Sequence, residues 1–164
     1  QQITEIKQSG QADAVIAILH GGQEYGRHRT KPQTIFTKMA ISAGADLVIC
    51  HHAHVVMGMD VINSRSAFYS LGNFCFGGNR NPQVKDTAIF QQTFTFVDGE
   101  LQNNISAKMI PCTISSTNSV NDFQPTVASG ERKATIIEEL NEYSKPYSEL
   151  QLDAEGMLYL GDKN

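Results

Sequence analysis

The amino-acid sequence predicts an α/β domain, and three segments carry that prediction. Residues 14–19 form a continuously apolar run rich in branched side chains, typical of a strand covered on both faces. Residues 32–43 place apolar side chains on one helical face, and residues 46–50 (DLVIC) are a second expected buried strand directly afterwards. A strand, a helix and a strand in this order form a right-handed βαβ unit by default. Both strands then end at the same edge of a sheet, where ligand sites of α/β proteins lie.

Local signals fix the first elements. Residues 1–10 read as the last turns of an amphipathic helix that Gly10 ends. For the helix over 32–43, Thr30 is the expected N-cap and Gly44 the terminator. Because the chain opens within a helix-to-strand connection, we expect it to be the C-terminal part of a longer domain.

The remaining elements follow from alternation and turn residues. Four further strands are expected, at residues 55–62, 67–71, 88–97 and 101–110. Asp98-Gly99 is a strong hairpin signal between the last two. Three C-terminal segments complete the chain, a loop over 111–129, a helix over 131–143 and a short edge strand over 157–160.

Composition excludes several classes of protein. A length of 164 residues suits one domain, so residues 1–164 are expected to be a single domain or a fragment of one. The net charge of -4 and the lack of a basic stripe argue against nucleic acid as a partner. The longest apolar run has six residues, too few for a transmembrane segment. Three scattered cysteines give neither a disulfide framework nor a zinc-knuckle spacing.

A histidine cluster follows the second predicted strand. His51, His52 and His54 fall within four positions, and neutral imidazole is the commonest side-chain metal ligand. In extended backbone, His52 and His54 point to one side and His51 to the other. The alternative is a polar loop that happens to be rich in histidine.

The first predicted strand also ends in histidine. His20 precedes Gly21-Gly22, which let the backbone turn and approach a ligand closely. Alone, His20 would be read as a structural residue, but the βαβ unit brings it to the same edge as His52 and His54. The three imidazoles could bind one metal or be shared between two. A two-metal site also needs bridging carboxylates, and no Asp cluster supplies them in this chain.

Other polar residues are candidates for supporting roles. Glu24 is a candidate general base, a partner of a histidine, or a solvated loop carboxylate. Asn73 could fix the tautomer of a ligating histidine or satisfy its own turn. Together with His51, these two residues are the candidate catalytic groups. A basic loop could bind an anionic substrate or be a mobile surface segment, and its residues are Arg27, His28 and Arg29.

Three motifs resemble the CapA family of bacterial capsule or poly-gamma-glutamate biosynthesis proteins. They are the segments 20–25 (HGGQEY), 43–55 (AGADLVICHHAHV) and 69–74 (YSLGNF). The resemblance is tight from Asp13 to Phe76. It divides the chain into a CapA-like core over 11–112 and a C-terminal loop, helix and tail over 113–164.

The resemblance implies the C-terminal half of a metallophosphoesterase-like αββα sandwich with mixed sheets. It makes His52 and His54 the two ligands of a Gly-His-x-His motif and His20 the isolated ligand before them. The Asp and Asn ligands of the family lie upstream, so the N-terminal half of the same domain is an implied partner. The family usually has Gly at Cys50 and Pro at Ala53, and these departures put substrate preference in doubt more than metal binding.

The implied function is capsule or poly-gamma-glutamate biosynthesis at the cell surface, with a divalent metal, Mn, Zn or Fe, as cofactor. The metal would assist hydrolysis or transfer at a phosphoryl or acyl group, acting on an anionic polymer or a small anionic substrate. The alternative is a non-catalytic cell-surface module that assists assembly or export of an anionic polymer, because a fold does not fix a function. A third reading is an α/β domain whose histidine-rich loop has no function.

Overall fold

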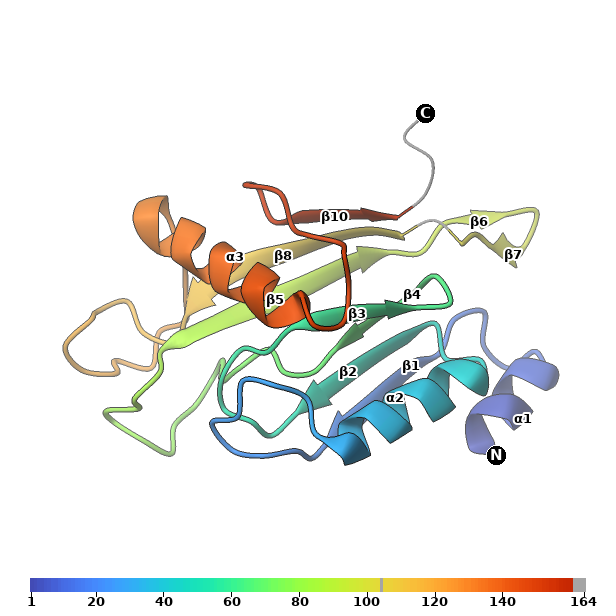
Figure 1. The fold of residues 1–164 in the computed structure, drawn as a ribbon, viewed down its shortest axis with the longest axis horizontal. Coiled ribbons are helices and arrows are strands. Elements are labelled where there is room, and N and C mark those ends of the chain that lie inside the picture. The colour runs from blue at the N-terminus through green and yellow to red at the C-terminus, as the bar shows by residue number, and fades with distance from the viewer. Residues whose placement is uncertain (104, 161–164) are drawn as a thin grey trace.

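Two β-sheets stacked face to face form the centre of the structure (Figure 1). The structure is a computed structural model that describes residues 1–103 and 105–160. The first sheet has four strands in the spatial order β1-β2-β4-β3. Their bounds are β1 Ile16–His20, β2 Leu47–His51, β3 Met59–Ile62 and β4 Arg65–Phe68. β1, β2 and β4 are parallel, and β3 runs antiparallel beside β4.

The second sheet is antiparallel. Its order is β10-β8-β5, and β9 pairs with the end of β8. The bounds are β5 Asp86–Thr93, β8 Ile105–Thr113, β9 Thr126–Val127 and β10 Met157–Leu160. A separate two-stranded ribbon, β6 Phe96–Val97 with β7 Glu100–Leu101, projects from the turn between β5 and β8.

Three helices accompany the sheets, α1 Gln2–Gln8, α2 Lys31–Ser42 and α3 Gly130–Ser144. α2 covers the outer face of the first sheet, in an apolar cluster with Ala17, Val48 and Cys50. Its start is a capping box, in which the Thr30 hydroxyl accepts from the Gln33 amide and the Gln33 side chain accepts from the Thr30 amide. Among the described residues, no helix is both long enough and apolar enough to cross a membrane.

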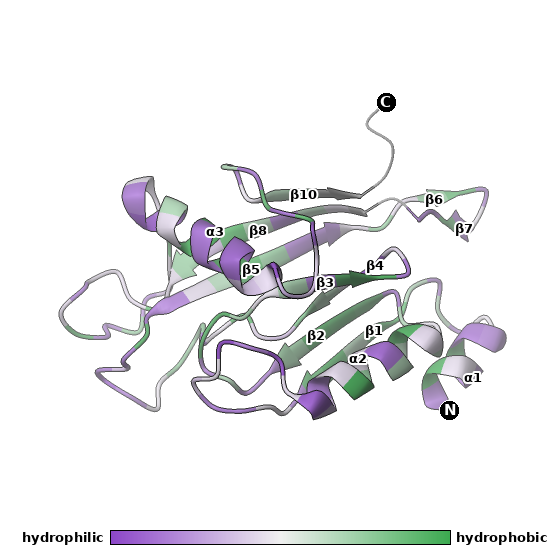
Figure 2. Ribbon diagram, viewed as in Figure 1, coloured by the Kyte–Doolittle hydropathy of each residue, from purple (hydrophilic) through white to green (hydrophobic). Residues whose placement is uncertain are grey.

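A second apolar cluster fills the space between the sheets. The rings of Phe68 on β4 and Phe90 on β5 lie 4.0 Å apart, which marks the direct contact of the two sheets. α3 contributes Ile136, Ile137 and Leu140 to the same cluster. Figure 2 shows β1 and β2 of the first sheet as mostly hydrophobic, whereas β5 and α3 mix polar and apolar residues. The αββα order implied by the resemblance places helices outside both sheets, but α3 contacts β3 and β8 and so closes the gap between the sheets.

The α/β class and the mixed sheets are confirmed, and most boundaries agree within two residues. The predicted parallel pair is β1 with β2, and the predicted hairpin is β5 with β8. Asp98-Gly99 adopts positive φ angles as expected, but it closes the small ribbon of β6 and β7 instead of the long hairpin. Cys50 is fully buried, and burial raises the pKa of its thiol to about 11, which fits a structural residue.

β1 is an edge strand with an uncovered apolar face. Ile16 and Ile18 pair in register with Leu47 and Ile49 of β2, so all four side chains point to one face of the sheet. On β2 this face belongs to the core between the sheets, where Leu47 is 3% exposed. On β1 it is open, because Ile16 is 50% and Ile18 is 65% exposed. The second sheet therefore does not extend over β1.

Candidate functional site

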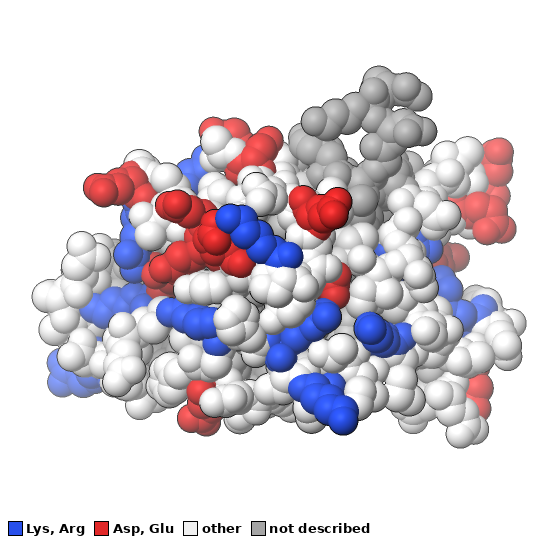
Figure 3. Space-filling model, viewed as in Figure 1, with Lys and Arg blue, Asp and Glu red and all other residues white. Residues whose placement is uncertain are grey.

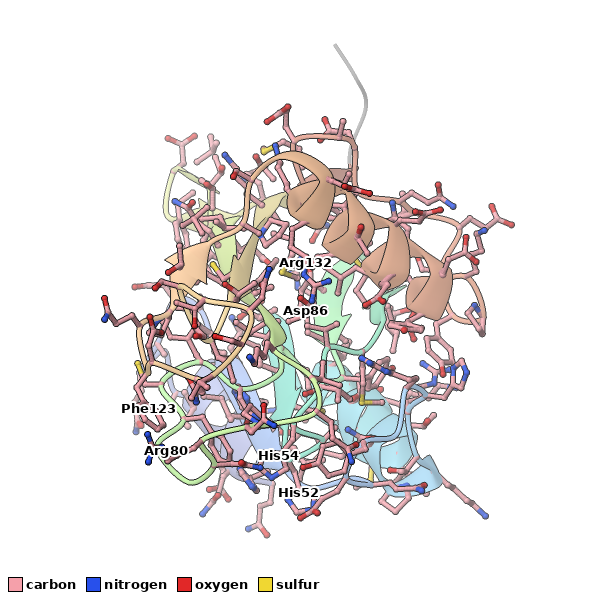
Figure 4. All side chains as sticks on the ribbon, turned by 90° about the vertical axis from the view of Figure 1, so that its left-hand side faces the viewer. His52, His54, Arg80, Asp86, Phe123 and Arg132 are labelled. Atoms are coloured by element: carbon pink, nitrogen blue, oxygen red, sulfur yellow. The ribbon has the colours of Figure 1, made fainter. Side chains whose placement is uncertain are left out.

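The histidines meet where β1 and β2 end. His20 and His51 are register partners on these strands, and His52 and His54 lie in the loop that follows β2. Figure 4 shows His52 and His54 at one end of the molecule. Two backbone hydrogen bonds join the loop after β1 to the loop after β2, from Gly21 to His51 at 3.1 Å and from Tyr25 to Ala53 at 2.8 Å.

His20 and His52 are in direct contact. The Nδ1 atom of His52 lies 3.3 Å from the Nε2 atom of His20, and their rings meet edge to face. Two nitrogens bound to one tetrahedral zinc ion at about 2.0–2.1 Å would lie roughly 3.3 Å apart. The pair therefore has the spacing of two ligands on one metal, and it is equally a hydrogen bond between neutral rings.

Asn73 fixes the tautomer of His54. Its Oδ1 atom lies 2.7 Å from the Nδ1 atom of His54, while its Nδ2 atom donates to the His54 carbonyl oxygen at 3.3 Å. Since Nδ2 is the donor, Oδ1 must accept, and the proton of His54 therefore sits on Nδ1. This leaves Nε2 of His54 with a free lone pair, as a metal-ligating histidine requires. The hydrogen bond between Asn73 and a loop histidine is thus present.

Two aromatic rings that the sequence did not single out flank His54. Tyr25 stacks on it with ring centres 6.1 Å apart, and Phe76 lies tilted at 5.4 Å. Tyr25 is the last residue of the first motif, and Phe76 lies two residues beyond the third. The available signal was an aromatic residue at or just beyond the end of each motif, but which ring faces His54 depends on how the loops fold.

The backbone of the histidine loop is strained. His52 has φ of 104° and His54 has φ of 60°, a region that residues with a side chain rarely occupy. Such conformations cost about 1–3 kcal/mol each and persist where surrounding contacts impose them. Here the strained positions are those that turn His52 toward His20 and His54 toward Asn73. Figure 4 locates the two histidines at this end of the molecule.

Of the three predicted metal ligands, His20 and His52 are in contact, and His54 lies apart from them. The ring centre of His54 lies 6.2 Å from that of His52. Within residues 1–103 and 105–160, no three His, Cys, Asp or Glu side chains are placed to hold one ion. A divalent metal therefore fits two donors, His20 and His52, with a third imidazole oriented nearby, and the remaining ligands would have to come from elsewhere.

The other two candidate catalytic residues differ in their surroundings. His51 is partly buried, and burial together with the nearby His20 lowers the pKa of its imidazole. Glu24 is exposed, and its carboxylate makes no hydrogen bond or ion pair to the described part of the chain. Its roles as general base or as partner of a histidine stay predictions.

The basic loop contacts the C-terminal part of the chain. Arg29 pairs with the buried Asp60 carboxylate and donates to the Tyr69 hydroxyl, and its guanidinium lies 4.1 Å from the centre of the Tyr147 ring. Burial and the Asp60 carboxylate raise the pKa of Tyr69. With its charge paired in this way, Arg29 is held as a structural residue.

Arg27 and His28 also connect the basic loop to other parts of the chain. Arg27 donates to the Val56 carbonyl oxygen at 3.3 Å and lies over the Tyr143 ring at the end of α3. His28 meets the same ring edge to face. These contacts dock the first loop onto α3 and give no support to substrate binding by the loop, which stays a prediction.

Comparisons with known proteins match this part of the chain. Residues 1–78 match the family described as "Bacterial capsule synthesis protein PGA_cap". The chain is 38% identical over 93 residues to "Capsule biosynthesis protein CapA" of Bacillus anthracis, which covers 56% of this chain and 22% of that protein. It is 38% identical over 80 residues to "PGA biosynthesis protein CapA" of Bacillus subtilis (strain 168). This match covers 49% of this chain and 21% of that protein.

The matched region contains the three predicted metal ligands, His20, His52 and His54, and also Asn73. The match spans about one fifth of the length of these curated relatives. Over its first 78 residues, the chain matches the family of bacterial capsule synthesis proteins, and it is similar to two CapA proteins.

Proposed function

We propose that this chain contributes the histidine side of a divalent-metal site in a protein of capsule or poly-gamma-glutamate synthesis. The observation that carries the proposal is the 3.3 Å contact between Nδ1 of His52 and Nε2 of His20. A divalent ion in such a site would polarise a phosphoryl or acyl group or activate water. His20 and His52 would hold the ion, and Asn73 would keep Nε2 of His54 free to join them.

Metal content tests the proposal directly. In the full-length protein, His52→Ala is expected to lower the bound Mn, Zn or Fe several-fold, because it removes one of the two adjacent donors. His28→Ala is the matched control, because His28 is an exposed histidine that contacts Tyr143 outside the cluster. The measurement is elemental analysis of the purified variants. Equal metal content in the two variants would contradict the proposal.

A second candidate function is a non-catalytic module that assists assembly or export of an anionic polymer at the cell surface. The observation that favours it is that the described residues contain no complete set of metal ligands. Polymer binding that persists with a chelator, without turnover of a phosphodiester in manganese or zinc, would support this candidate. Binding or turnover that a chelator abolishes would support the metal site.

The segment that supplies the remaining metal ligands would attach at the open edge of β1. An unpaired edge strand presents free backbone donors and acceptors, and exposed apolar side chains beside it mark an interface. His20 stands at the end of this strand, so a strand added along β1 would bring its own end next to the histidines. The occupant that we propose is a strand of the same protein from outside these 164 residues, in the part by which the relatives are longer.

Substitution on β1 tests this attachment. In the full-length protein, Ile18→Ser is expected to lower the free energy of unfolding by about 2 kcal/mol, the contribution of a buried isoleucine. Val127→Ser is the control, since Val127 on β9 is 62% exposed and Ile18 is 65% exposed. Its cost is expected to stay within about 0.5 kcal/mol. Urea unfolding gives both values, and equal small costs would mean that no strand covers β1.

A further inference from the structure

A polar hollow outside the histidine site has the properties of an anion-binding pocket. It has a volume of about 590 Å³ and lies between the segment before β5, the end of β8 and the first turn of α3. Pockets of roughly 300–1,000 Å³ are the usual size for small ligands. Two of its eight lining residues are cations, Lys85 and Arg132, and none is acidic. In a chain of net charge -4, a hollow lined only by neutral and positive residues is an exception.

Both cations keep donors available. The Lys85 ammonium donates to the Asn118 carbonyl oxygen at 2.7 Å, which uses one of its three N–H bonds. Arg132 pairs with the buried Asp86 carboxylate through one nitrogen, and its side chain is 50% exposed. Because a guanidinium has five donors, this ion pair orients Arg132 and leaves several donors free. Figure 4 shows Arg132 and Asp86 together, and Figure 3 shows basic side chains at this end of the molecule.

Neutral donors complete the lining. The side-chain amides of Asn81 and Gln83 make no hydrogen bond to the described part of the chain. An amide can donate two hydrogen bonds to an oxyanion. The hollow therefore combines the positive charge of Lys85, the remaining donors of a guanidinium that Asp86 holds in place, and uncommitted amide donors. This is the chemistry that recognises a carboxylate or a phosphate. A divalent cation is a poor fit, because no carboxylate lines the hollow.

The pocket is held in shape by a buried amide. Asn121 is 2% exposed, and its side-chain amide donates to the carbonyl oxygens of Phe76 and Asn79 at 3.3 and 3.1 Å. Its backbone amide donates to the Arg80 carbonyl oxygen. These bonds tie the segment before β5 to the loop after β8. Phe76, at the start of that segment, contacts His54. One fixed segment thus runs from the histidine site to the hollow.

We propose that this hollow binds an anionic group, a carboxylate or a phosphate, through Lys85 and Arg132. The proposal goes beyond the metal site and does not depend on it, because none of the histidines lines the hollow. Anion binding should therefore survive removal of metal. Failure of either proposal would leave the other standing.

Charge insertion tests the pocket without removing a contact. Gln83→Glu in the metal-free, full-length protein keeps the side-chain shape but places a carboxylate in the hollow that Lys85 also lines. Calorimetric titration with inorganic phosphate and, separately, with glutarate at constant ionic strength is expected to show at least tenfold weaker binding than in the unmodified protein. Gln91→Glu, the same change at an exposed position of β5, is expected to leave both affinities within twofold.

A second variant and the two ligands make the outcome unambiguous. Lys85→Gln is expected to weaken binding several-fold, whereas Lys38→Gln on the exposed face of α2 is expected to have no effect. Tighter binding of phosphate or of glutarate identifies which anion the pocket prefers, and either result supports the proposal. No saturable binding of either anion, or equal weakening by Gln83→Glu and Gln91→Glu, would overturn it.

Discussion

Asp60→Ala is expected to lower the free energy of unfolding by about 3–5 kcal/mol, the usual cost of breaking a buried ion pair from one side. The Asp60 side chain is 6% exposed, and it accepts from both the Arg29 guanidinium and the Tyr69 hydroxyl. Removing the carboxylate leaves the Arg29 charge in a site of low exposure without its counter-ion. The first loop would then lose one of its main attachments.

Urea unfolding of the full-length protein gives the cost. The matched control is Glu142→Ala, which breaks the exposed pair of Glu142 with Lys145 on α3. An exposed pair contributes about 0–1 kcal/mol, so this variant should unfold close to the unmodified protein. A cost of Asp60→Ala no larger than that of Glu142→Ala would show that the buried pair does not hold the loop.

Gly58→Ala is expected to destabilise the fold by about 3 kcal/mol or more, because α3 docks directly on the glycine backbone. A Cβ atom at Gly58 would lie 2.1 Å from the carbonyl oxygen of Tyr143, and this obstacle is backbone that cannot rotate away. Next to it, the Ser144 hydroxyl accepts from the Met59 amide at 2.9 Å and donates to the Leu140 carbonyl oxygen. Overpacking a tight core costs typically 1–3 kcal/mol, and displaced backbone adds to this.

Gly77→Ala is the control for Gly58→Ala. A Cβ atom at Gly77 would meet no heavy atom within 4 Å, so only chain entropy changes there. Thermal and urea unfolding should show a large loss for Gly58→Ala and a change within about 0.5 kcal/mol for Gly77→Ala. Similar stabilities of the two variants would mean that α3 can shift without cost, and the close contact would then have no structural importance.

The elements of the fold were largely predictable because their signals are local. The apolar runs at 14–19 and 47–50 specify two strands, and Thr30 with the apolar spacing over 32–43 specifies the helix between them, all without any distant contact. The small hairpin of β6 and β7, residues 96–101, illustrates the limit. Asp98-Gly99 correctly marks a turn, but the choice between a short ribbon and a long hairpin depends on how β5 and β8 pair beyond it.

The site was predictable in part for the same reason. The parallel pairing of β1 and β2 follows from the order of elements, so the approach of His20 to the loop of His52 could be expected. The ion pair of Arg29 with Asp60 could not be predicted from the sequence, because Asp60 is 31 residues away, on β3. The rings of Tyr25 and Phe76 around His54 likewise depend on loop geometry that no local pattern encodes.

The uncovered edge of β1 also affects how this chain behaves in isolation. Its free amides and carbonyls lie beside two protruding isoleucines, a combination that favours pairing between identical copies. At high protein concentration such copies would assemble edge to edge and bury the very histidines that are of interest. A lysine in place of Ile18 would oppose this self-association by charge, and would keep preparations of the short chain monodisperse for spectroscopy of the imidazoles.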